Sequence, residues 1–90
     1  MHEYSADIDE ALSNALGEER LFRVIIEFFF RPESRQIGEL RRIGISVRKV
    51  FDTYPLVSGI ANSEQIRRLM KLPYIKKILL DSTFRTPEQV

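Results

Sequence analysis

The sequence repeats one pattern, QIGELRRIG at residues 36–44 and QIRRLMKLP at residues 65–73. In both segments a Gln-Ile pair is followed by a leucine, by basic and aliphatic residues, and finally by glycine or proline, which end helices. Each segment leads into a strand pattern with basic residues between aliphatic ones, VRKV at residues 47–50 and IKKI at residues 75–78. The repeat therefore predicts two helix–strand units of one design.

A strand is expected before each of these helices. Alternation along LFRVIIEFFF, residues 21–30, places Val24, Ile26, Phe28 and Phe30 on a core face and Arg23, Ile25, Glu27 and Phe29 on the other face. A second strand, residues 56–61, follows a turn at residues 52–55. The resulting order, β-α-β-β-α-β, predicts an α+β, ferredoxin-like sandwich of four antiparallel strands with two helices on one face.

The residues before this unit predict a short helix at about 8–16, because Asp7 and Glu10 have capping-box spacing. Gly17 suits the left-handed position that ends such a helix. We therefore divide the chain into an N-terminal extension with a short helix (1–20), a ferredoxin-like domain (21–82) and a C-terminal tail (83–90).

Composition excludes several classes of function. The net charge is +1, from 14 basic and 13 acidic residues, so neither nucleic acid nor a membrane surface is an expected partner. The chain has no cysteine, and its one histidine is His2, so a Ser-His-Asp or Cys-His site on the folded part is excluded. No phosphate-binding glycine loop is present. We expect no enzyme, cofactor or metal site.

The predicted arrangement leaves one face of the sheet without a helix. We expect Ile25 and Phe29 from the first strand to share this face with Lys77, Leu79 and Asp81 from the last. Phe29 beside Leu79 would form a contiguous apolar patch, which marks an interface on a small domain. An RNA-recognition domain would need stacking aromatics here, and LVSGIAN, residues 56–62, has none.

The order and spacing of these segments resemble the propeptides of subtilisin-like serine proteases, over about residues 8–81. The ending carries most of the similarity: a helix, Leu72-Pro73, two aliphatic residues three apart (Ile75 and Ile78), and Asp81 three later. Such domains are inhibitors and intramolecular chaperones of their protease. The resemblance implies a partner protease that acts in cis or in trans.

The same resemblance assigns roles to the end of the chain. It implies that Asp81 caps a helix N-terminus on the protease. It also implies an inhibitory tail that enters the active-site cleft as a strand, with Phe84 in a large apolar subsite; this tail comprises Ser82, Thr83, Phe84, Arg85 and Thr86. The chain departs from the family pattern at Leu79 and Leu80, where glutamates are common, and at Pro87, which disfavours strand pairing and cleavage.

An alternative is a ferredoxin-like oligomerisation or small-ligand-sensing module, in which the open face forms a homodimer. The N-terminal residues have no signal-peptide pattern, and no apolar run is long enough to span a bilayer. Localisation therefore stays open, and secretion is expected if the chain is an excised prodomain.

Overall fold

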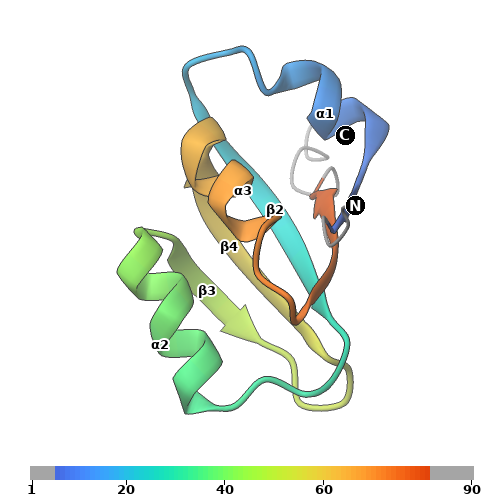
Figure 1. Ribbon diagram of the computed structural model, residues 1–90, viewed down its shortest axis with the longest axis vertical. Coiled ribbons are helices and arrows are strands. Elements are labelled where there is room, and N and C mark those ends of the chain that lie inside the picture. Colours follow the sequence, from blue (N-terminus) through green and yellow to red (C-terminus); the bar gives the residue numbers. More distant parts are fainter. Residues whose placement is uncertain (1–5, 82–90) are drawn as a thin grey trace, which may run out of the picture.

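The computed structural model describes residues 6–81. Along this part the order of elements is β1 (Asp7–Ile8), α1 (Glu10–Ala15), β2 (Leu21–Phe28), α2 (Ser34–Ile43), β3 (Ser46–Val50), β4 (Leu56–Asn62), α3 (Ser63–Leu69) and β5 (Ile75–Leu80). The strands form one sheet in the order β1-β5-β2-β4-β3. The molecule is therefore a small α+β domain with a mixed sheet and helices packed against it (Figure 1).

The sheet differs from the expected one because it has five strands and is not wholly antiparallel. The additional strand, β1, pairs in parallel with β5, so that Asp7 lies opposite Lys77 and Ile8 opposite Ile78. This strand has only two residues, so no alternation predicts it, and it contains Asp7, whose predicted role as a helix cap was wrong: α1 begins at Glu10, with Asp9 at its N-cap. The predicted α+β class is therefore confirmed, but the prediction of four strands, all antiparallel, was incorrect.

One face of the sheet carries the hydrophobic core. Phe22, Val24, Ile26 and Phe28 alternate along β2 and are each at most 1% exposed. The helices add their own buried residues to the same cluster: Leu12 of α1, Ile37 and Leu40 of α2, and Ile66 and Leu69 of α3. All three described helices thus pack on this face, and α3 lies across β2 and β4 in Figure 1.

The end of β2 corrects one predicted core position. The strand ends at Phe28, so Phe30 lies beyond the sheet and is 48% exposed. Its ring approaches Tyr74, with centroids 6.4 Å apart, while Phe28 stacks on the same tyrosine at 5.9 Å. Phe30 therefore lies beside the core and not within it.

Local chemistry explains where α2 and α3 begin and end. Asn62 and Gln65 cap α3 reciprocally: the Gln65 N–H donates to Asn62 Oδ1 at 2.9 Å, and the Asn62 N–H donates to Gln65 Oε1 at 2.8 Å. Gly44 ends α2 in the left-handed region with φ of 109°, as predicted. Gln65 also donates from Nε2 to the Gly44 carbonyl at 3.2 Å, which ties the two helix ends together.

The described part of the N-terminal extension packs onto the rest of the chain. Leu12 is fully buried, and the Arg67 guanidinium donates to the Leu16 carbonyl at 3.1 Å. The predicted role of Gly17 was wrong: α1 ends at Leu16 in a right-handed conformation, and within residues 6–81 only Gly44 is a glycine with positive φ. Residues 6–20 share their core with residues 21–81.

Candidate docking face of the sheet

The face of the sheet opposite the helices can be built row by row from the strand register. Leu79 of β5 lies opposite Ile25 of β2, which lies opposite Ser58 of β4, and Lys49 of β3 follows. One row to one side are Asp7, Lys77, Glu27 and Leu56. One row to the other side are Arg23, Ile60 and Ser46. We call these three rows the open face.

The open face has an apolar centre and charged ends. Ile25, Leu56, Ile60 and Leu79 are all half-buried, although no described helix covers them. The flanking rows bring Asp7, Lys77 and Glu27 to one end, and Arg23 with Asp81 to the other. An apolar centre with a polar rim is the usual anatomy of a protein–protein interface.

Asp81 is the last described residue and lies at the corner of the open face. Its backbone N–H donates to the Arg23 carbonyl at 2.9 Å, which continues the β2–β5 ladder by one residue. The residue is half-buried. The predicted tail, Ser82 to Thr86, lies outside the described residues.

The register supports four of the five predicted docking residues as neighbours. Ile25, Lys77, Leu79 and Asp81 lie on one face, as the alternation predicted. Phe29 does not adjoin Leu79: it is four residues along the chain from Ile25, about 13 Å at strand spacing. It lies just past β2 and is 64% exposed. The predicted Phe29–Leu79 patch is therefore incorrect.

The apolar centre includes two residues of β4 that were not predicted to lie on this face. Leu56 and Ile60 fill the places beside Glu27 and Arg23 on β4. Alternation in LVSGIAN puts Leu56 and Ile60 on the face opposite Val57, but only the pairing with β2 shows which of the two faces is open. The apolar centre therefore extends from β5 through β2 to β4.

An ion pair crosses one edge of the open face. The register between β2 and β5 shifts after Glu27, and Lys76 is the extra residue of β5. The Lys76 Nζ lies 3.8 Å from Glu27 Oε2, with both side chains partly exposed. The pair places the Glu27 carboxylate beside Lys76 of β5. An exposed pair of this kind contributes little to the free energy of folding.

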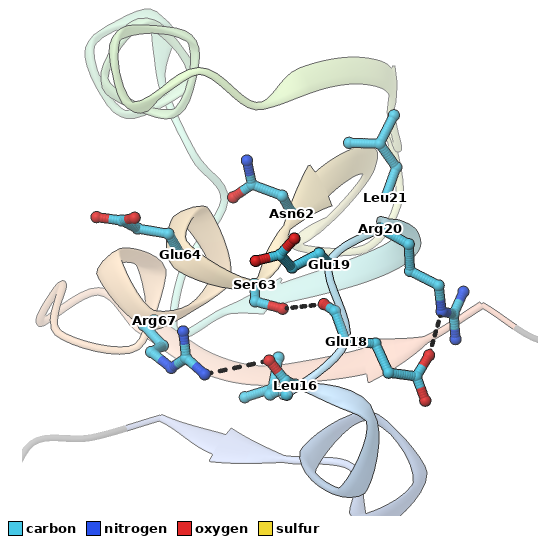
Figure 2. A pocket seen from close by; sticks show the side chains of 10 residues that line it. Leu16, Glu18, Glu19, Arg20, Leu21, Asn62, Ser63, Glu64 and Arg67 are labelled. Carbon is cyan, nitrogen blue, oxygen red and sulfur yellow. Dashed lines mark hydrogen bonds and ion pairs between the residues drawn. The ribbon is translucent and has the colours of Figure 1, made fainter.

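A separate hollow of about 560 Å³ lies between the α1–β2 connection and the start of α3 (Figure 2). Its polar groups are used to hold that connection: the Ser63 hydroxyl donates to the Glu18 carbonyl at 3.0 Å, and Arg67 to the Leu16 carbonyl. Arg20 pairs with the Glu18 carboxylate at 2.6 Å. These contacts account for the polar groups that line the hollow, so none of them needs a ligand to explain it.

Within residues 6–81, no group of three or more His, Asp or Glu side chains is placed to hold a metal ion. In the same range, no helix has the length and apolar character needed to cross a membrane. In comparisons with known proteins, no family model matches the sequence, and no curated protein matches it.

Proposed function

We propose that this chain is a prodomain-like inhibitor and folding chaperone of a subtilisin-like serine protease. The single observation that carries the proposal is the open face, with its half-buried apolar centre between charged ends. In this proposal, β2-α2-β3-β4-α3-β5 is a ferredoxin-like unit to which β1 adds an edge strand. The ending that resembles subtilisin propeptides, Ile75 to Asp81, forms β5 and the corner of that face.

The proposed docking uses the apolar centre and the corner separately. Ile25 and Leu79 pack against surface helices of the protease, where burial of apolar area supplies most of the affinity. Asp81 lies at a helix N-terminus of the protease, where free N–H groups and the dipole favour a carboxylate. The tail after Asp81 then enters the active-site cleft as an extended strand.

Chaperone action follows from the same contacts. A domain that binds the folded protease and not its unfolded chain stabilises the folded state by mass action. Docking helices that are not yet packed would favour their native arrangement. The open face therefore serves both inhibition and folding.

Inhibition of peptide hydrolysis tests the proposal. We expect the domain at micromolar concentration to inhibit a cognate subtilisin-like protease, and Leu79→Asp to weaken inhibition at least tenfold, since a buried charge without a partner is costly. Lys71→Asp, on an exposed residue after α3, is the control and should inhibit like the wild type. No inhibition of any subtilisin-like protease in a broad panel would overturn the proposal.

A second candidate is a homodimer through the open face, which the same apolar centre favours. Light scattering of the free domain tests it. A dimer that Leu79→Asp converts to monomer would support this candidate. A monomer at tens of micromolar would count against it.

A further inference from the structure

Charge is distributed unevenly between the two edges of the sheet. Residues 6–20, which include β1 and α1, contain five acidic residues and one basic residue. Residues 31–50, which include α2 and β3, contain six basic and two acidic residues. Because β1 and β3 are the two outermost strands, the near-neutral chain has an acidic edge and a basic edge. In Figure 1, α1 lies near β5 and α2 lies beside β3.

The basic edge also exposes a strand. β3 pairs with β4 on its inner side, and among the described strands it has no neighbour on its outer side. Four of its five residues are exposed and the fifth, Val47, is half-buried. An edge strand of this kind presents N–H and C=O groups that can pair with another chain.

The direction of these groups can be assigned at one residue. The Phe51 N–H points inward and donates to the Leu56 carbonyl at 3.0 Å. Because successive residues of an antiparallel strand point alternately toward and away from the partner, Val50 turns its N–H and C=O outward. A strand added to β3 would therefore bond Val50.

The cations at this edge are not neutralised within residues 6–81. Arg41 and Arg42, in the last turn of α2, and Arg48 in β3 are exposed and have no ion pair with a described residue. Lys49 lies with its Nζ 4.8 Å from the centroid of the Phe51 ring. Four positive charges therefore lie along or beside the exposed strand.

We propose that the outer edge of β3 binds an extended acidic segment of a partner protein by adding it to the sheet as a further strand. The backbone pairs with β3, and the carboxylates meet Arg41, Arg42 and Arg48. A second copy is disfavoured at this edge, because antiparallel pairing of two β3 strands would bring like charges together. The phosphates of a nucleic acid could pair with these cations, but a nucleic acid would not form strand hydrogen bonds with the outward N–H and C=O groups of β3.

This inference does not rest on the proposed function: the edge of β3 adjoins the open face at Lys49, but the proposed protease contacts, Ile25, Leu79 and Asp81, lie on and beside β2 and β5. If the acidic peptide does not bind β3, the proposal of protease docking is unaffected. If the domain does not inhibit a protease, the proposal for the edge of β3 is unaffected. The two proposals therefore have separate readouts.

The test uses a fluorescent seven-residue peptide of alternating Glu and Val, with a Lys–Val peptide of the same length as its counterpart. Anisotropy should report binding of the acidic peptide only, and this binding should weaken as salt increases. The double variant Arg41→Glu/Arg48→Glu should weaken it at least tenfold. Lys71→Glu, on the helix side, should leave it unchanged.

Amide hydrogen exchange distinguishes strand addition from simple charge attraction. The acidic peptide should slow exchange of the Val50 amide. Val50→Pro should weaken binding, because proline removes the outward N–H of β3 that would bond the peptide, whereas the hydrogen bonds between β3 and β4 do not use this N–H. Equal binding of the two peptides, or binding without protection at Val50, would overturn the proposal. Tighter competition by a short single-stranded DNA than by the acidic peptide would overturn it in favour of a phosphate-binding edge.

Discussion

Ile25 and Ile26 are neighbours in β2, yet they point to opposite faces of the sheet. Ile26 is fully buried under the helices, whereas Ile25 is half-buried opposite Leu79 and Ser58, with no helix above it among residues 6–81. The hydrophobic core that stabilises folding lies on one face. The proposed docking depends on the apolar side chains of the other face, which no described helix covers.

Truncation on each face gives the largest contrast. Ile26→Ala should reduce the free energy of unfolding by about 2–5 kcal/mol, because it removes apolar contacts and leaves a cavity. Ile25→Ala should cost about 1 kcal/mol or less, since its side chain already borders solvent. Urea unfolding of both variants measures the difference, and equal losses would show that both faces contribute equally to folding.

A charge on the open face should separate binding from folding. Leu79→Asp should weaken protease inhibition by about 2 kcal/mol, in the range of interface hot spots. It should lower the free energy of unfolding by less than that, because the carboxylate remains partly hydrated in the free domain. The comparison fails if the variant is unfolded by circular dichroism; Leu79→Ser then provides the milder substitution.

The helix caps on the core face should show an intermediate effect. Asn62→Ala removes the acceptor of the Gln65 N–H and should cost about 1 kcal/mol. Thermal unfolding measures this loss. Asn62→Asp keeps a capping oxygen and should recover most of the stability, whereas Asn62→Leu, which is of similar size but has no acceptor, should not.

Tyr74, at the border of the core face, predicts a stability change at alkaline pH. Burial raises the pKa of this phenol, and its hydrogen bond to Glu39, at 2.5 Å, and the charge of that carboxylate raise it further. The folded state therefore disfavours ionisation. Its contribution to stability is complete below about pH 10, the ordinary tyrosine pKa, and is lost as the pH rises beyond it.

Unfolding measured from pH 8 to 11 checks this behaviour. Tyr74→Phe should flatten the alkaline decline in stability relative to the wild type. Tyr54→Phe is the matched control, because Tyr54 is 60% exposed in a turn. Equal declines in all three proteins would remove Tyr74 as the cause.

The smallest effect is expected from the ion pair on the open face. Glu27→Gln removes the partner of Lys76 and should change the free energy of unfolding by a few tenths of a kcal/mol, as for other exposed pairs. A loss above about 1 kcal/mol in chemical denaturation would mean that this face supports folding more than its exposure indicates.

Much of the fold was predictable from local signals. Gly44 as a helix end and the strand that begins at Ile75 follow from residue type and spacing, and the structure confirms them. β1 was not predictable in this way, because two residues have no period and their partners in β5 lie 70 residues further along the chain. Strand ends were also missed, as Phe30 shows.

The candidate face was predictable only in part for the same reason. Alternation within one strand placed Ile25 and Leu79 on one face, but only the register shows that they lie opposite each other. It also separates Phe29 from Leu79 and adds Leu56 and Ile60. Register depends on contacts between distant segments, which residue spacing within one strand does not contain.

Gln65 connects the two similar halves of the chain through its side-chain hydrogen bonds. Its one side chain caps the start of α3 and bonds the carbonyl that ends α2, so neither helix end is complete without the other. The two similar halves should therefore open together in hydrogen exchange, unlike the modules of a repeat protein, which unravel one at a time. A single amide side chain would in this way make two copies of one design into one cooperative unit.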